Sequence, residues 1–263
     1  MVETMKYLCE VSYVGTHFHG FQAQKNKRTV QGVLTDAAAR VFGVPCAITG
    51  CSRTDSGVHA KAFCLTLDPA DKNLHIPTDK LPRAMAVALP PDLSIRAARL
   101  VEDGFHPRYD AKGKEYTYYF SHFPVNDPFL VDRVWQIRYP FLPDALEKMR
   151  QAAEAFCGRQ DFSAFMSQGS PVKDTVRTVK SARVDLEEGI FAFRVIADGF
   201  LYNMVRIMTG TLVSVALGRL QAQKIPEIIA SGIRASAGET APPEGLYLSR
   251  VFYDEKDFAK KTR

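Results

Sequence analysis

A helix and the strands around it decide the fold, and the helix is encoded by residues 29–45, TVQGVLTDAAARVFGVP. Thr29 has the side chain of an N-cap, and apolar residues recur after it at three- and four-residue spacing. Gly43 and Pro45 then end the helix. Before it, residues 6–13 alternate in polarity, which is typical of a half-buried strand.

The elements expected along the rest of the chain repeat one order in its two halves. After the first strand and helix, the first half gives the order β-β-α-β, at residues 47–50, 63–67, 81–88 and 95–101. The second half gives the order β-α-β-β-α-β, at residues 115–120, 145–156, 179–186, 191–196, 201–217 and 247–252. Each half therefore matches the order of a ferredoxin-like unit.

The composition predicts an ordinary globular protein. The chain has 263 residues, of which 46% are hydrophobic, enough to fill a core. Its N-terminus lacks the apolar stretch of a secretion signal, and no apolar run is long enough to cross a bilayer, so we expect a cytoplasmic protein without a membrane partner. The five cysteines are scattered and form no Cys-x-x-Cys pair, which predicts reduced, mostly buried thiols.

The charge permits a polyanionic partner without requiring one. The formal net charge is +5 and the pI is near 8.9. Basic residues gather in three segments, which contain Lys25, Lys27 and Arg28; Arg108, Lys112 and Lys114; and Lys173, Arg177 and Lys180. On composition alone these segments are equally well three solvated loops.

These patterns together predict an α+β protein. Its two ferredoxin-like β-α-β-β-α-β units, residues 1–105 and 106–263, would join into one antiparallel sheet with the helices on one face. The other face would carry a basic cleft for a nucleic acid.

The polar segment CSRTDSGVHA, residues 51–60, lies between two apolar runs of the first half. A loop held by rigid strands is where catalytic groups tend to lie. Spacing alone does not decide the role of Asp55, because an aspartate at such a position also serves as a turn former that bonds to its own backbone.

A resemblance to a known family bears on this choice. RTDSGVHA, residues 53–60, resembles the signature RTDAGVHA of the tRNA pseudouridine synthase A family. Four further segments resemble that family in the same order, at residues 13–32, 105–118, 200–206 and 241–248. Ser52 and Ser56 stand where glycine and alanine are usual, and these substitutions could alter target preference.

The resemblance implies an isomerase that converts uridine to pseudouridine in the anticodon stem-loop of tRNA, at tRNA positions 38–40. It implies a homodimer, with no cofactor and no metal. It assigns the catalytic roles to Asp55, Arg206 and Tyr116. It assigns substrate binding to Arg53, Thr54, His59 and Leu246, and RNA binding to Lys25, Lys27, Arg28, Arg108, Lys112 and Lys114.

Each catalytic role follows from what the chemistry needs. A carboxylate can act as nucleophile or base, and a nearby guanidinium from Arg206 would keep it ionised in a pocket that excludes water. Tyr116 would stack on a uracil flipped out of its helix, and Leu246 would form the apolar floor beneath that base. Arg53 would fill the vacated space or hold phosphates, or it would pair with Asp55 instead. Without the resemblance, the pattern favours Arg206 as a surface arginine of an amphipathic helix, and Tyr116 could be a core aromatic of its strand.

Three other interpretations remain open from sequence. A related synthase could act on other tRNA or rRNA uridines. A non-catalytic RNA-binding protein would carry an aromatic RNA-recognition signature, which we do not find. A glycosidase would need two opposed carboxylates.

His17 and His19 have the spacing of a pair on one strand face, but they lack a third convergent metal ligand.

Overall fold

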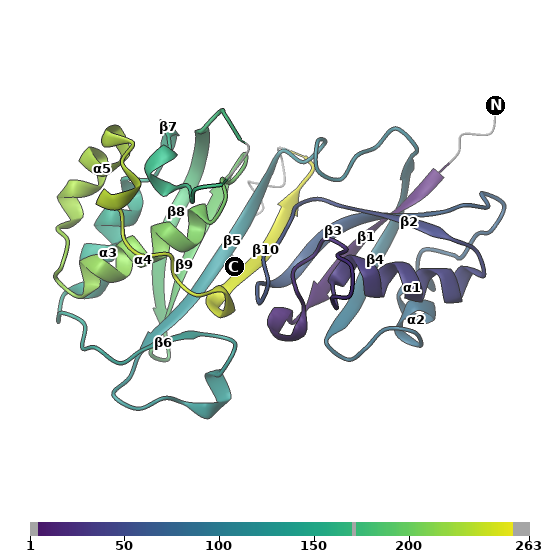
Figure 1. Cartoon of the computed structure of the whole chain (residues 1–263), viewed down its shortest axis with the longest axis horizontal. Helices are drawn as coiled ribbons and strands as arrows, with labels where there is room; N and C mark the ends of the chain where they lie inside the picture. Colours follow the sequence, from purple (N-terminus) through teal and green to yellow (C-terminus); the bar gives the residue numbers. More distant parts are fainter. Residues whose placement is uncertain (1–4, 170–171, 255–263) are drawn as a thin grey trace. The chain divides into compact units, whose positions relative to one another are not determined.

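The computed structural model describes residues 5–169 and 172–254, and these divide into two compact units (Figure 1). Of the described residues, the first unit contains residues 5–112 and 248–254, and the second contains residues 113–169 and 172–247. The chain is α+β, with mostly antiparallel strands. Among the described residues, no helix is long and apolar enough to cross a membrane.

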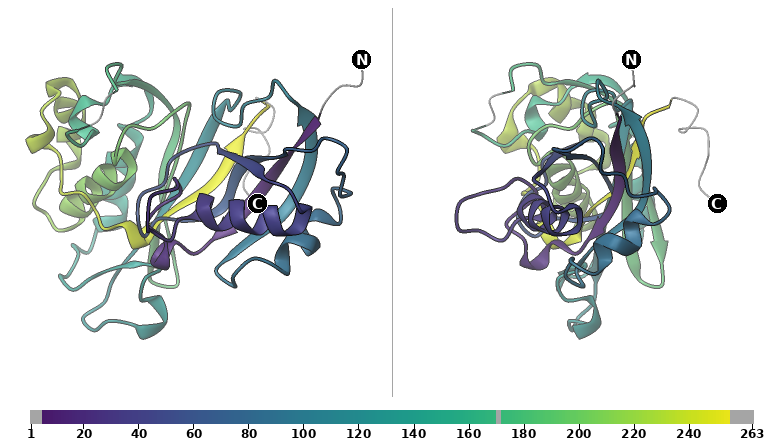
Figure 2. Two further views of the ribbon diagram at one scale, coloured as in Figure 1. Left: turned by 45° about the vertical axis from the view of Figure 1, so that its right-hand side comes forward. Right: turned by 90° about the vertical axis from the view of Figure 1, so that its right-hand side faces the viewer.

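The first unit follows the expected order of strands and helices. Its elements are β1 (Met5–Tyr13), α1 (Val30–Phe42), β2 (Cys46–Gly50), β3 (His59–Pro69), α2 (Leu81–Ala86), β4 (Leu93–Glu102) and, near the end of the chain, β10 (Leu246–Phe252) from Leu248 onward. The strands are ordered β4-β1-β3-β10, and β2 also pairs with β3. β1 is antiparallel to β3 and β4, and β2 is antiparallel to β3. In Figure 2, β10 runs beside β3 as the yellow strand.

Helix α1 confirms the prediction from residues 29–45. The Thr29 side chain accepts a hydrogen bond from the Gly32 amide, and Gly43 ends the helix with a φ of 71°. Such a left-handed C-cap favours glycine because it has no Cβ atom. The face that carries Leu34 and Phe42 is buried, and α1 contacts α2 as well as strands β2 and β3. The two helices therefore lie on the same side of this unit's sheet.

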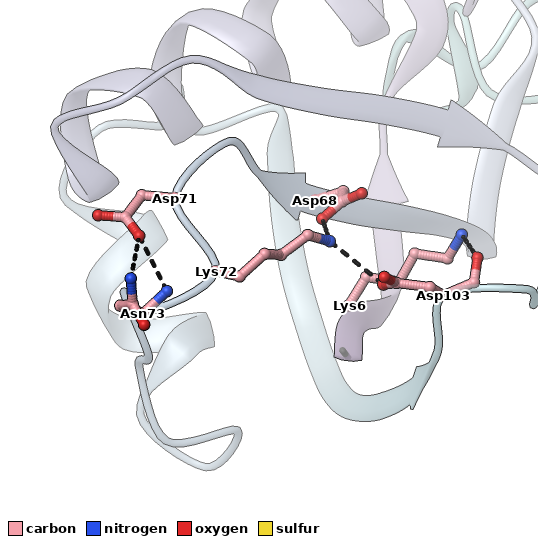
Figure 3. A network of polar contacts seen from close by, with 6 residues as sticks. All are labelled: Lys6, Asp68, Asp71, Lys72, Asn73 and Asp103. Atoms are coloured by element: carbon pink, nitrogen blue, oxygen red, sulfur yellow. Dashed lines mark hydrogen bonds and ion pairs between the residues drawn. The ribbon is translucent and has the colours of Figure 1, made fainter. Parts of the chain in front are cut away.

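Charged side chains join the edges of the first unit's strands (Figure 3). Lys72 forms ion pairs with Asp68, at the end of β3, and with Asp103, which follows β4. Lys6 on β1 donates to the Asp103 carbonyl oxygen at 2.7 Å. Each of these exposed contacts adds little stability, but together they connect β1, β3 and the end of β4 to the loop that carries Lys72.

The second unit carries more elements than expected. Its strands and α-helices are β5 (Gly113–His122), β6 (Trp135–Ile137), α3 (Ala145–Glu154), β7 (Gly158–Asp161), β8 (Val176–Glu187), β9 (Ile190–Ala197), α4 (Met204–Ala216) and α5 (Ile225–Ser231). The strands are ordered β5-β9-β8-β7, and β6 lies parallel to β5. The simple β-α-β-β-α-β order predicted for this half omits β6, β7 and α5, and its last strand, residues 247–252, belongs to β10, which lies mostly in the first unit. These three elements are too short, and β7 too polar, to give a periodic signal.

Six short 3-10 helices complete the described chain. They lie at Gly15–His17, Pro128–Leu130, Ser163–Phe165, Ala222–Lys224, Arg234–Ser236 and Pro243–Gly245. His17 belongs to a 3-10 helix, so the pair formed by His17 and His19 does not lie on a strand.

Helix α4 forms the centre of the second unit. The apolar residues Leu201, Met204, Val205, Met208 and Leu212 are buried, and Arg206 is half-buried. α3 packs against both α4 and β8 (Figure 1). The cysteines also agree with the sequence, because all five are free thiols and only Cys157 is exposed.

Candidate active site

The loop that carries Asp55 connects two hydrogen-bonded strands, β2 and β3. The Cys51 amide donates to the Cys64 carbonyl at 2.9 Å, so strand pairing continues to the first residue of the loop. The loop then turns at Gly57, which has a φ of 82°, and the Val58 amide donates to the Asp55 carbonyl at 3.2 Å. Asp55 is half-buried at this turn.

A second loop, residues 14–28, packs directly on the Asp55 loop. The Phe21 amide donates to the Thr54 carbonyl at 3.1 Å, and the Gly57 amide donates to the Phe18 carbonyl at 3.3 Å. The Ser56 hydroxyl also donates to that Phe18 carbonyl, at 3.2 Å. The two loops are therefore joined by main-chain hydrogen bonds on both sides of Asp55.

Two glycines of the second loop make this contact possible. A Cβ atom on Gly15 would overlap the Val58 carbonyl group. Gly20 has a φ of 81°, and a Cβ atom there would lie 2.5 Å from the Thr54 carbonyl oxygen. Gly15 and Gly20 therefore mark the positions at which the backbones of the two loops lie closest to each other.

Thr54 and His59 lie inside the first unit. Thr54 is 7% exposed, and its hydroxyl is hydrogen-bonded to the Tyr13 hydroxyl at 2.8 Å. His59 is 1% exposed, and its Nδ1 atom accepts a hydrogen bond from the Gly15 amide at 2.9 Å. These contacts fix both ends of the Asp55 loop. The role of Thr54 and His59 in substrate binding stays a prediction.

The residues predicted to bind RNA have different environments. The Arg28 guanidinium forms a bidentate ion pair with Asp92, at 2.8 and 3.0 Å, and lies 3.9 Å from the centre of the Phe18 ring. These contacts of Arg28 fix the loop of residues 14–28. Lys114 is only 9% exposed. The exposed members of the set are Lys25, Lys27, Arg108 and Lys112, and the predicted substrate ligand Arg53 is exposed as well.

Arg206 lies in the first turns of α4, and the second unit fixes its orientation. The Nε atom donates to the Ala241 carbonyl at 2.7 Å, and an Nη atom donates to the Asn203 side-chain oxygen at 2.7 Å. The Asn203 amide group in turn donates to the Ser167 hydroxyl at 2.9 Å. Two acceptors on different segments thus define the plane of the guanidinium.

Asn203 has a backbone conformation that suits few side chains. Its φ is 61°, in the left-handed region, at the residue immediately before α4. Asparagine tolerates this conformation better than most non-glycine residues. Asn203 lies within residues 200–206, which resemble the family, but no role was predicted for it. Its position three residues before Arg206 is the signal that could have identified it.

Tyr116 and Leu246 are both buried, each 7% exposed. The Tyr116 ring packs edge-on against Phe200, with ring centres 5.0 Å apart. Leu246 begins β10. Two residues along β5, the buried Tyr118 hydroxyl donates to the Pro242 carbonyl at 2.6 Å. Burial raises the pKa of Tyr118 well above its ordinary value, so this hydroxyl remains a donor.

The predicted site residues thus fall in both units. Asp55, Arg53, Thr54 and His59 belong to the first unit, whereas Arg206, Tyr116 and Leu246 belong to the second. The ion pair between Asp55 and Arg206 stays a prediction. Within residues 5–169 and 172–254, no group of three or more His, Cys, Asp or Glu side chains could hold a metal ion.

Comparison with known proteins identifies the family. The model of the tRNA pseudouridine synthase family matches residues 10–110 and 152–254, which is more than half of the chain. The chain belongs to this family. The matched residues include the Asp55 loop, Arg206 and Leu246, whereas Tyr116 and residues 111–151 lie outside the match.

Curated relatives agree with this assignment over nearly the whole chain. The chain is 42% identical over 243 residues to the tRNA pseudouridine synthase A of Thermoanaerobacter sp. (strain X514), covering 92% of this chain and 97% of the relative. The protein of the same name from Acetivibrio thermocellus is 42% identical over 245 residues, with the same coverage. A solved Cbf5-Nop10-Gar1 complex aligns with 92% of this chain and 58% of its own at 14% identity. Its TM-score of 0.34 is too low to support an argument.

Proposed function

We propose that this chain is a tRNA pseudouridine synthase that isomerises uridines of the anticodon stem-loop, at tRNA positions 38–40, with Asp55 as its catalytic carboxylate. The observation that carries the proposal is the Asp55 loop itself. In a member of this family, a half-buried aspartate lies on a turn that a second loop holds on both sides by main-chain hydrogen bonds. Such rigidity is what a group that must meet one atom of a flipped base requires.

The reaction rearranges bonds within one nucleotide. The bond between uracil N1 and C1′ breaks, the base turns within the site, and C5 forms the new bond to C1′. The C5 hydrogen leaves to water, and N1 takes up a proton, so no oxidant or reductant is consumed. The Asp55 carboxylate would attack C1′, add to C6, or remove the C2′ proton, and each of these roles requires the ionised form.

Arg206 suits the task of keeping that carboxylate ionised. Burying an unpaired carboxylate raises its pKa, and an adjacent guanidinium opposes that shift. The Arg206 side chain is already held through Nε and one Nη atom, so its orientation is set before substrate binds. Little side-chain entropy would then be lost when the ion pair with Asp55 forms.

The remaining residues would bind the substrate. Tyr116 would stack on the extruded uracil, and Leu246 would form the apolar floor of its pocket. Arg53, exposed beside Asp55, would fill the gap in the RNA helix or contact its phosphates. Thr54 and His59 would contribute to substrate binding from the buried side of the Asp55 loop. The exposed basic residues Lys25, Lys27, Arg108 and Lys112 would neutralise the phosphate backbone, together with Arg28 and Lys114.

We extend the proposal to architecture and assembly. The β-α-β-β-α-β order of the first unit supports the view that this unit is ferredoxin-like. The second unit would be ferredoxin-like as well, with added strands and with β10 as its last strand. Their sheets would join edge to edge and bind RNA on the face opposite the helices. The protein would act in the cytoplasm as a homodimer.

The decisive experiment uses tRNA that carries tritium at uridine C5. Bonding C5 to C1′ expels that hydrogen, so wild-type protein should release tritium into water. Asp55→Ala and Asp55→Asn should release none above background while still binding tRNA. If Asp55→Ala retains wild-type release, the assignment of the carboxylate is wrong. If the wild type binds tRNA and releases nothing, a non-catalytic RNA-binding protein is the better interpretation.

A second candidate differs only in the target. Ser52 and Ser56 depart from the residues usual in the family, and Ser56 contacts the second loop through the Phe18 carbonyl. Sequencing the modified RNA at single-nucleotide resolution would distinguish the targets. Modification confined to other tRNA positions or to rRNA would favour a related synthase of different specificity.

A further inference from the structure

The second unit contains a cavity of about 420 Å³ that no residue of the proposed catalytic set lines. Three segments form its walls: β6 with the residues after it, the C-terminal end of α4, and the residues before the last strand. The lining residues are Trp135, Gln136, Ile137, Arg138, Tyr139, Val213, Leu217, Arg219, Glu239, Thr240 and Pro242. Its size lies within the range of small-ligand sites.

The chemistry of the lining favours a ligand that combines an aromatic ring with a negative charge. Trp135 and Tyr139 offer aromatic faces, and Tyr139 is 63% exposed. The Arg219 guanidinium lies 5.5 Å from the centre of the Tyr139 ring. Arg138 is exposed and contributes a second guanidinium. Proteins bind single-stranded nucleic acid through this combination, because aromatic rings stack on the bases and guanidinium groups contact the phosphates.

We propose that this cavity binds one unpaired nucleotide of RNA. The base would stack on Trp135 and Tyr139, and its phosphate would bind to Arg138 and Arg219. Glu239 and Thr240 provide polar groups that could contact the edge of the base. This inference rests on the proposed function only for the source of the nucleotide, because a free nucleotide has the same chemistry.

One wall of the cavity also holds Arg206. The Ala241 carbonyl accepts from Arg206 Nε, and the Ala241 amide donates to the Arg206 carbonyl at 3.2 Å. The next residue, Pro242, lines the cavity and accepts from the Tyr118 hydroxyl. Arg234 braces the same segment by donating to the Thr240 hydroxyl at 3.0 Å. A nucleotide in the cavity would therefore order the segment that positions Arg206.

The chain provides its own reporter for this site. Trp135 is the single tryptophan of the sequence, and it lines the cavity. Tryptophan fluorescence, excited where tyrosine does not absorb, therefore reports on this cavity alone. We expect a short single-stranded RNA to quench the emission in a saturable way, at a concentration at least about tenfold below that of uridine monophosphate. Inorganic phosphate alone should leave the emission unchanged.

Variants of exposed lining residues test the assignment without disturbing the core. Arg219→Gln and Tyr139→Ala should each weaken the RNA-induced quenching by about tenfold. Arg159→Gln is the matched control, because Arg159 is exposed on β7 and does not line the cavity. Equal weakening by the control variant would show that general charge, and not the cavity, determines binding, and would overturn the proposal.

Two further results separate this inference from the proposed function. Quenching by free nucleotide at concentrations as low as those of RNA would overturn the assignment to RNA, and absence of saturable quenching by any of the probes would overturn the site itself. Asp55→Ala should quench like the wild type. If that variant also retains full tritium release, the catalytic proposal fails while the cavity proposal stands.

Discussion

The Asp55 loop and the surroundings of Arg206 fix a functional side chain in two different ways. Around Asp55 the contacts are made by the backbone, with two loops bonded through amides and carbonyls and two glycines at the points of closest approach. Around Arg206 the backbone belongs to an ordinary helix, and side-chain hydrogen bonds set the guanidinium. Substitutions near Asp55 should therefore affect folding, whereas substitutions near Arg206 should affect activity more than stability.

The largest effect should come from Gly15→Ala. The new methyl group would overlap the Val58 carbonyl, and neither backbone can move without breaking the bonds between the loops. We expect a loss of about 3 kcal/mol or more in the free energy of unfolding, measured by urea denaturation. Gly104→Ala is the control, because a Cβ atom at Gly104 meets nothing within 4 Å. Equal stability of the two variants would contradict the close approach.

Replacing Arg206 with lysine should chiefly affect activity. An ammonium group cannot bond to the Ala241 carbonyl and the Asn203 side chain in the plane that the guanidinium occupies. We expect tritium release to fall about 100-fold, equivalent to about 2.7 kcal/mol of transition-state stabilisation, with a stability change below about 1 kcal/mol. A variant that loses stability in proportion to activity would argue that Arg206 is only structural.

Asn203 allows the backbone and the side chain to be tested separately. Asn203→Gly keeps the left-handed conformation but removes the bond to Arg206, so activity should fall about tenfold with little loss of stability. Asn203→Ala should lose the same activity and an additional ~1 kcal/mol of stability, because alanine is strained at that φ. Unfolding curves and tritium release measured on both variants test these expectations. Equal stability of Asn203→Gly and Asn203→Ala would contradict the backbone strain at residue 203.

The bond between Tyr13 and Thr54 should contribute a smaller amount. Tyr13→Phe and Thr54→Val each remove one partner of a buried hydrogen bond 2.8 Å long. We expect each change to cost about 1 kcal/mol of stability, and the double variant to cost less than the sum. Strict additivity in this cycle would show that the two hydroxyl groups do not stabilise each other.

Thiol labelling should detect almost no reaction in the folded protein. Burial raises the pKa of the Cys64 thiol above its ordinary value, and raises that of Cys9 to about 12, so both remain protonated at neutral pH. Cys157 is exposed, but burial of part of its thiol raises its pKa as well. We expect one thiol of five to react slowly with a disulfide reagent, faster as pH rises. Rapid reaction of Cys51 would reveal local opening beside Asp55.

Local sequence signals predicted the features that depend on neighbouring residues. Thr29 and Gly43 marked the ends of α1 because a cap and a left-handed glycine act within one turn of the helix. The Asp55 segment was also correctly expected to be a loop between two strands. By contrast, β7 is four polar-rich residues long and carries no periodic signal.

Contacts between residues far apart in the chain could not be predicted from the sequence. Arg28, whose role in RNA binding stays a prediction, pairs with Asp92, 64 residues away, because the loop before α1 meets the loop before β4. Likewise, the contact of Arg206 with Ala241 joins segments 35 residues apart. Such contacts depend on how the strands and helices pack, and no local pattern encodes that packing.

The return of the chain to its first unit has a consequence for biosynthesis. Strand β10 lies beside β3, although almost 180 residues separate them, so a ribosome must make the whole second unit before the first unit has all its strands. Because β2 already pairs with residues 65–69 of β3, only the rest of that edge of β3 lacks its partner strand while the residues of the second unit emerge and can already fold. An exposed strand edge invites pairing with other nascent chains, so newly made copies are most vulnerable to aggregation in that interval.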